Sequence, residues 1–306
     1  MQLTKKKKKR KIYSKEDYIF DTVNYIILTF VVIVTLYPFL NTLAVSFNDA
    51  LDSVRGGIYL WPRKFTLYNY THILGDPQIY RAALVSVSRA LITSVLNVAC
   101  SLVVGYVLTR KDFVLRGFYS KIFMYSMYIS GGMIPMYFLI RDLGLQNNFL
   151  VYVLPGIVSA WNIMVVRSYI DGLPDALIES AKIDGANELT IIFKIIMPLC
   201  VPVLATVALF VAVGQWNSWF DTMLYCSGDP KLSTLQYELQ KVLKSSSQVT
   251  TAAAAAQASQ NGASNSVTPN AVRSAMTIVA VAPILFAYPF LQKYFVSGLT
   301  LGGVKG

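Results

Sequence analysis

Apolar residues gather in six long runs along the chain, and charged or polar segments separate these runs. An α-helix needs about 20 mostly apolar residues to cross the hydrocarbon core of a bilayer. The runs predict membrane spans at about 25–45, 82–108, 119–140, 149–169, 195–213 and 275–295. The predicted fold class is therefore all-α, a polytopic membrane protein with six transmembrane helices.

Several of these runs contain residues that interrupt helices. Such interruptions are tolerated in a membrane where neighbouring helices or a water-lined cavity satisfy the freed backbone groups. They suit a transporter, but ordinary packing of transmembrane helices is an equal alternative at any one position. The residues concerned are Gly131, Gly132 and Pro135 in the third run, Pro155 and Gly156 in the fourth, Pro198 and Pro202 around the fifth, and Pro283 and Pro289 in the sixth.

The distribution of charge predicts the orientation. Hydrophobic residues make up 55% of the 306 residues, and the formal net charge is +11. The basic residues lie in a terminal block at 5–11 and in short segments between apolar runs, a pattern that favours anionic lipid headgroups over nucleic acid. The positive-inside rule and an even number of spans place both termini in the cytoplasm, with a basic cytoplasmic tail at 1–17 and a membrane domain at 18–306. The expected location is the cell membrane.

The same count assigns the loops to the two sides of the membrane. The loops at 46–81 and 214–274 are expected outside, and the loop at 170–194 is expected in the cytoplasm. No charged residue occurs at 245–272, where Ser, Thr, Ala, Gln and Asn dominate. Such a segment buries too little apolar surface to order itself, so 245–270 is predicted to be a flexible extracellular insertion. A plain spacer and a binding element remain open as its role.

Motifs for catalysis or for metal binding are not apparent in the sequence. Cys100, Cys200 and Cys226 are not spaced as a disulfide framework or a metal site, and His72 has no second histidine to share a ligand. The chain lacks HExxH, GxSxG and the GxxxxGK[ST] phosphate loop. We therefore predict no catalytic residue, no metal site and no bound cofactor.

The cytoplasmic loop carries the most information. Residues 169–201 read YIDGLPDALIESAKIDGANELTIIFKIIMPLCV. Gly172 is suited to end the fourth span in a left-handed conformation, and the pattern then predicts a short helix over 174–183, a turn at Asp184 and Gly185, and a second helix from about Asn187. A helix this short does not hold itself in water, so a partner is expected to dock on its small-residue face.

This loop resembles the EAA loop of ABC importer permeases. The motif is Glu-Ala-Ala, then Gly, then Ile-x-Leu-Pro, and its spacing is matched here with Ser180 and Met197 as the two departures. The resemblance implies a cytoplasmic coupling helix between spans 4 and 5 that receives force from ATP-binding subunits. The coupling residues it implies are Glu179, Ser180, Ala181, Asp184, Gly185, Ala186 and Pro198.

A second resemblance covers the end of the chain. Gly298-Leu299-Thr300 and Gly303-Val304-Lys305-Gly306, together with the segment at 215–220, are similar to carbohydrate-uptake permeases related to the smaller membrane subunit of the maltose system. The resemblance implies import of an oligosaccharide. It also implies a second homologous permease, an extracellular solute-binding protein and two ATP-binding subunits, which would bind the ATP and Mg²⁺.

Polar residues inside spans, and aromatic residues at their ends, are the candidates for substrate contact. Ionisable and amide side chains are costly in a membrane and usually face the bundle interior, while an aromatic belt at the interface is the competing explanation for the tryptophans. The candidate pathway residues are Arg89, Asn97, Asn162, Trp216, Asn217, Trp219 and Asp221. Arg89 is compatible with an acidic sugar or with an ion pair to another helix.

The sequence leaves two other functions open. A permease for another polar solute, such as a peptide or a polyol, would carry the same coupling loop. A self-contained secondary transporter would need internal repeats, and no convincing repeat relates the first three spans to the last three.

Overall fold

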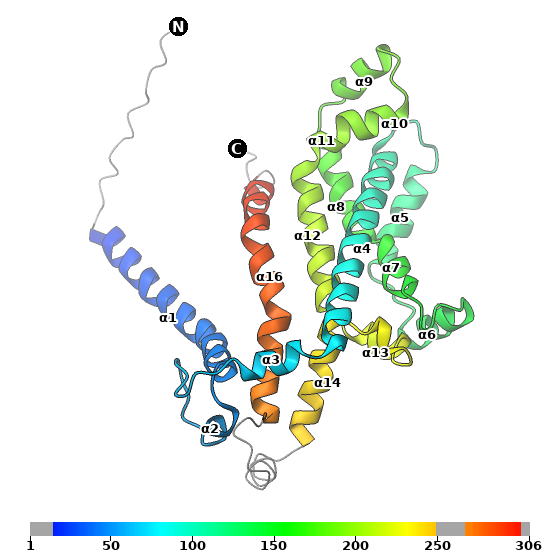
Figure 1. The fold of residues 1–306 in the computed structure, drawn as a ribbon. Coiled ribbons are helices and arrows are strands. Elements are labelled where there is room, and N and C mark those ends of the chain that lie inside the picture. The colour runs from blue at the N-terminus through cyan, green and yellow to red at the C-terminus, as the bar shows by residue number, and fades with distance from the viewer. Residues whose placement is uncertain (1–14, 249–266, 301–306) are drawn as a thin grey trace.

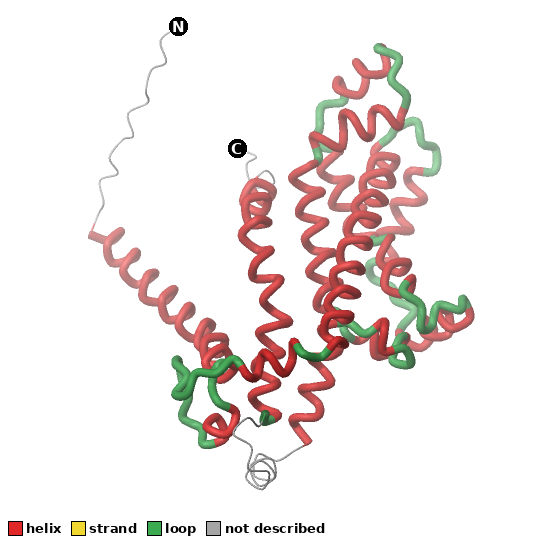
Figure 2. Tube along the Cα trace, in the orientation of Figure 1, coloured by secondary structure: helices red, strands yellow, loops and turns green. Residues whose placement is uncertain are grey.

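The computed structural model describes residues 15–248 and 267–300, and Figure 1 shows their arrangement. The described residues are mainly helical and form no strand, with one isolated antiparallel bridge between Asn48 and Phe65 (Figure 2). Most of the predicted basic tail and of the predicted insertion lies outside these residues.

Three helices of the described chain are long and apolar enough to cross a membrane: α1 (Lys15–Ser46), α4 (Pro77–Thr109) and α16 (Pro269–Thr300). Two bent pairs raise the number to five if each is one span. The first pair is α7 (Leu150–Ile157) with α8 (Ala160–Ile170), bent by 43°. The second bend, of 83°, separates 188–199 from α12 (Val201–Asn217).

The third predicted span is not the single helix that its apolar run predicts. It is divided between α5 (Arg116–Ser126) and α6 (Met133–Asp142), and residues 127–132 between them are not helical. Gly132 adopts φ +88°, a conformation that favours glycine. Hydropathy averaged over a window does not detect such a break, because the residues in it carry no charge and apolar residues lie on both sides, although Gly131 and Gly132 indicate an interruption there.

The fifth predicted span begins too early. Residues 188–199 form α10 (Glu188–Thr190), the π-helical segment η1 (Ile191–Ile196) and α11 (Met197–Leu199), all before the 83° bend. The straight helix α12 starts at Val201 and continues to Asn217, beyond the predicted end at 213. Pro202 lies in the first turn of α12, where the missing N–H costs nothing.

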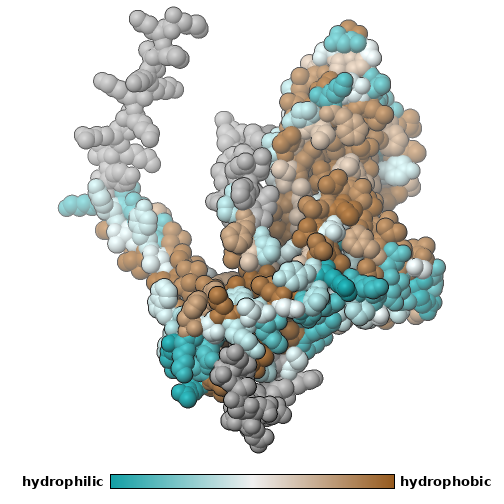
Figure 3. Space-filling model, viewed as in Figure 1, coloured by the Kyte–Doolittle hydropathy of each residue, from teal (hydrophilic) through white to brown (hydrophobic). Residues whose placement is uncertain are grey.

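Short helices and loops gather at the two ends of the bundle (Figure 1). One end carries α9 (Ala176–Ile183) and α10. The other carries α2 (Ala50–Val54), α3 (Tyr68–Leu74), α13 (Phe220–Tyr225), the 3₁₀ turn η2 (Pro230–Leu232) and α14 (Leu235–Gln248). Residues 245–248 therefore belong to a helix and not to the predicted insertion. Figure 3 shows an apolar surface between these hydrophilic ends, which suits a membrane protein.

Helix α4 is the centre of the bundle and packs on both α12 and α8. The largest buried cluster joins Leu102 and Tyr106 of α4 to α8, α9, η1 and α12. In contrast, α1 packs mainly along α16, and most of its apolar side chains are exposed. The exposed apolar length of α1 requires a covering of lipid or of other membrane helices.

Candidate functional site: a coupling loop and a buried polar network

The loop at 170–194 has the predicted helix–turn–helix form. Helix α9 ends at Ile183, and Gly185 follows in a left-handed conformation with φ +77°. The Gly185 N–H donates to the Lys182 carbonyl at 3.1 Å, and the Asn187 side chain caps α10 by accepting from the Thr190 N–H at 2.8 Å. The left-handed glycine is thus Gly185, whereas Gly172 was expected to adopt that conformation and does not.

One face of α9 packs on the bundle and the other is open. Ala181, with its neighbour Ile178, is buried in the main apolar cluster, and Ala186 packs partly buried against the same cluster. Glu179, Ser180, Asp184 and Gly185 are exposed, as is Pro198 before the 83° bend. The predicted coupling residues therefore divide into an anchored set and an open set.

Charged side chains tie this loop to the end of α4. The Tyr106 hydroxyl donates to Glu188 Oε2 at 2.6 Å, and Lys182 Nζ lies 3.0 Å from Glu188 Oε1. Lys182 also reaches Asp112 Oδ2 at 3.5 Å. The hydrogen bond with Glu188 raises the pKa of Lys182, which keeps it cationic. Sequence reasoning did not identify these residues, because nothing in their spacing shows that α4 ends beside the loop.

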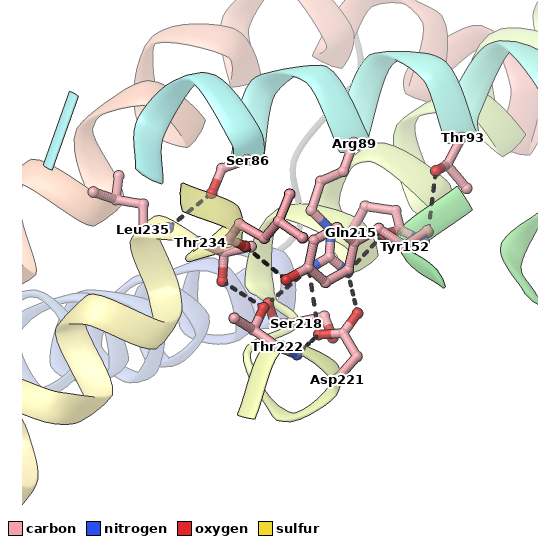
Figure 4. A network of polar contacts seen from close by, with 11 residues as sticks. Ser86, Arg89, Thr93, Tyr152, Gln215, Ser218, Asp221, Thr222, Thr234 and Leu235 are labelled. Carbon is pink, nitrogen blue, oxygen red and sulfur yellow. Dashed lines mark hydrogen bonds and ion pairs between the residues drawn. The ribbon is translucent and has the colours of Figure 1, made fainter. Parts of the chain in front are cut away.

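A second cluster of polar side chains lies inside the bundle, at the end opposite to α9 (Figure 4). Arg89 of α4 is 1% exposed, and its Nε and Nη2 donate to Gln215 Oε1 at 3.0 and 2.7 Å. The guanidinium also forms an ion pair with Asp221 and lies 4.4 Å from the centroid of the Tyr152 ring. The charge of Arg89 is therefore satisfied within the chain, as the ion-pair alternative predicted.

Further contacts hold the partners of Arg89 in place. Asp221 Oδ1 accepts hydrogen bonds from the Ser218 hydroxyl and the Thr222 N–H, both at 2.9 Å. The Tyr152 hydroxyl donates to the Leu232 carbonyl at 2.7 Å. This network joins α4 to α7, α12, α13 and η2 at that end of the bundle.

Two buried asparagine side chains form hydrogen bonds at the bend between α7 and α8. Asn97 Nδ2 donates to the Gly156 carbonyl at 2.8 Å and to the Ile157 carbonyl at 3.2 Å. Asn162 Nδ2 donates in turn to Asn97 Oδ1 at 2.8 Å. Because a helix bend frees carbonyls that lipid cannot satisfy, these two asparagines explain how the fourth span is able to break.

Replacing Asn97 with alanine is expected to lower the free energy of unfolding by about 1–3 kcal/mol, because it removes a hydrogen-bond donor from two partly buried carbonyls and an acceptor from the buried Asn162. Alanine at the exposed Asn217 serves as the control and should change stability by less than about 0.5 kcal/mol. Denaturation by SDS in mixed micelles measures both variants. Equal stability of the two would show that the buried amides do not hold the bend.

The remaining candidate pathway residues include one buried side chain and others that are exposed or partly exposed. Trp216 is buried, and its Nε1–H donates to the Ala280 carbonyl at 3.0 Å, which fixes α12 to α16. Asn217 is exposed and accepts from Gln236 at 3.3 Å. Trp219 is partly exposed, with Lys244 Nζ 5.6 Å from the centroid of its ring. Of the seven candidate pathway residues, only Asn217, Trp219 and Asp221 are at least partly exposed.

The helical bundle, its apolar belt and its docking loop define a helical membrane transport component. Residues 97–301 match the family described as "Binding-protein-dependent transport system inner membrane component", and the chain belongs to that family. The resemblance seen in the coupling loop is thereby confirmed.

Curated relatives extend the likeness over nearly the whole chain. The polygalacturonan/rhamnogalacturonan transport system permease protein YtcP of Bacillus subtilis is 32% identical over 94% of this chain and 99% of its own. The arabinooligosaccharides transport system permease protein AraQ of Halalkalibacterium halodurans is 31% identical over 90% of this chain and 94% of its own.

A solved structure has the same fold. It is a bacterial ABC transporter involved in the import of the acidic polysaccharide alginate, and the matching chain has a TM-score of 0.79 and 29% identity, over 93% of this chain and 99% of that one. Members of this family are permease components of ABC importers in the membrane, which work with another permease, ATPases and a binding protein. The chain is accordingly a transport component and not an enzyme.

Proposed function

We propose that this permease carries an oligosaccharide into the cell and that its coupling loop links ATP hydrolysis by separate subunits to alternating access. The carbohydrate permeases among its relatives support the cargo. The half-anchored α9 supports the coupling, because a helix packed on its own bundle through one face and open on the other is able to pass force between two subunits.

In this mechanism the ATPase binds the open face of α9 at Glu179, Ser180 and Asp184. Its movement reaches α4 through the Lys182–Glu188–Tyr106 contacts. It reaches α12 through η1, whose wider π-helical turn often marks a functional site. Because α4 and α12 pack closely on each other, both would tilt together and change which side of the membrane the cavity faces.

The topology proposed with this function has six spans, with α5 and α6 together as the third. Both termini and α9 then face the cytoplasm, as the positive-inside rule predicts.

The solute-binding protein would dock outside on the loops at 46–81 and 214–274, the latter with the insertion at 245–270. A second, homologous permease would cover exposed apolar helices such as α1, and lipid would cover the rest. ATP and Mg²⁺ belong to the two ATP-binding subunits, and no nucleic acid is expected as a partner.

Transport by the purified complex tests the cargo. The permease is reconstituted into proteoliposomes with its partner permease, two ATPases and binding protein, and entry of labelled oligosaccharides is followed with and without ATP. We expect ATP-dependent entry of an oligosaccharide, tested with neutral and with uronic-acid chains because two relatives are named for such polymers. ATP-dependent entry of a peptide or a polyol instead would overturn the proposal that the cargo is an oligosaccharide. ATP-independent entry by the chain alone would favour a secondary transporter.

A further inference from the structure

Two neighbouring spans break at the same depth. The Ser120 hydroxyl of α5 accepts from Arg167 Nη1 of α8 at 2.7 Å, so the middle of α5 lies beside the second half of α8. Because the two helices run in opposite directions, the end of α5 at Ser126 lies toward the start of α8 at Ala160. The break at 127–132 thus lies beside the bend between α7 and α8.

This depth lies inside the membrane. Helix α5 has 11 residues and starts at Arg116, close to the cytoplasmic coupling end. At about 1.5 Å per residue it extends about 16 Å, roughly half of a hydrocarbon core that is about 30 Å thick. The non-helical residues after Ser126 therefore begin near the middle of the bilayer.

The two breaks differ in how their polar atoms are satisfied. Asn97 donates to two carbonyls at the bend between α7 and α8, and Asn162 donates to Asn97. At 127–131, by contrast, the carbonyls accept no hydrogen bond from the described residues. The segment is also open, since Tyr128 is 82% exposed and no side chain approaches the Cβ position of Gly131 within 4 Å.

Lipid cannot cover such a segment, because an unpaired backbone group in hydrocarbon costs several kcal/mol, by the usual order-of-magnitude figure. Water and sugar hydroxyls donate to a run of carbonyls whatever its spacing, whereas a protein surface would have to supply a matching row of donors. The exposed Tyr128 ring adds an aromatic face beside these acceptors. The predicted pathway residues Arg89, Asn97 and Trp216 are already committed to contacts within the chain.

We infer that residues 127–132 line the solute pathway and contact the sugar, through the carbonyls of 127–131 and the ring of Tyr128. This inference rests on the proposed function, and it assigns a place for the solute on this subunit. It also explains the break itself, because a continuous helix would bury these carbonyls in its own hydrogen bonds.

Cysteine accessibility in the assembled transporter tests the inference. Ser130→Cys is nearly isosteric, and a charged, membrane-impermeant thiol reagent is applied to the complete importer in its resting and ATP-bound states. We expect labelling in at least one state and a loss of uptake after labelling. Sugar at ten times its Kd leaves about one eleventh of the sites free, so it should slow labelling about tenfold.

Two controls define the outcome. The unsubstituted chain reports the native cysteines, of which Cys200 and Cys226 are buried, and Ile163→Cys places a thiol at a fully buried position of α8, where a charged reagent should not reach it. Absence of labelling at Ser130→Cys in every state would show that protein covers the segment and would overturn the inference. Labelling without protection by a sugar that the unsubstituted importer carries would overturn the sugar contact. Failure of that importer to carry any sugar would instead refute the proposed function.

Discussion

Replacing Gly185 with proline abolishes ATP-driven uptake while the permease remains in the membrane; this is the expected result for the turn after the coupling helix. Gly185 has φ +77°, whereas proline fixes φ near −65°, and the substitution also removes the N–H that donates to the Lys182 carbonyl. A conformational penalty of about 1.4 kcal/mol already changes an equilibrium tenfold, so uptake should fall at least about tenfold. Initial rates of solute entry, normalised to the amount of assembled complex, measure the effect.

Gly144→Pro is the matched control. Gly144 also follows a helix end, has φ +67° and donates its N–H to a carbonyl three residues earlier, that of Arg141, but it lies between α6 and α7 and away from α9. It should strain the backbone similarly and leave coupling intact. Glu179→Lys, which reverses a charge on the open face of α9 and leaves the turn unchanged, should lose uptake as well. Normal uptake by both Gly185→Pro and Glu179→Lys would contradict the role of the loop.

Replacing Asp221 with alanine is expected to lower the free energy of unfolding by about 3–5 kcal/mol, because it leaves the charge of Arg89 buried without a counterion. The neutral Gln215 remains beside the guanidinium but cannot balance its charge. Denaturation by SDS in mixed micelles measures the change. The effect should be far larger than that of Asp171→Ala, which removes a more exposed ion pair with Arg167 and should cost about 0–1 kcal/mol.

A double variant separates the charge from the packing. Arg89→Met together with Asp221→Ala removes both charges, so it should be more stable than Asp221→Ala alone. If the double variant is instead the less stable of the two, Arg89 contributes mainly through its contacts with Tyr152 and Gln215. An Asp221→Ala variant no weaker than Asp171→Ala would show that Arg89 gains its counterion elsewhere.

The helix–turn–helix form of the loop was predictable because its signals are local. Small residues in α9, a glycine where the chain reverses and the fixed distance to Pro198 all lie within one short segment. Its anchorage was not predictable, because Tyr106 lies 82 positions before Glu188 and nothing in the sequence relates them. The positions of the apolar runs were likewise readable, while the bend between α7 and α8 depended on Asn97, which a different span supplies.

Hydropathy, charge bias and turn chemistry act over short distances, so the sequence alone indicates a helical membrane protein with a helix–turn–helix loop. Only the tertiary structure decided the roles of the polar residues inside the spans. Arg89 meets Gln215 and Asp221 across more than 120 positions, and Asn97 pairs a bend formed by a different span. The reason is physical: the cost of a buried polar group depends on what folding brings to it, and a sequence shows the group but not its partner.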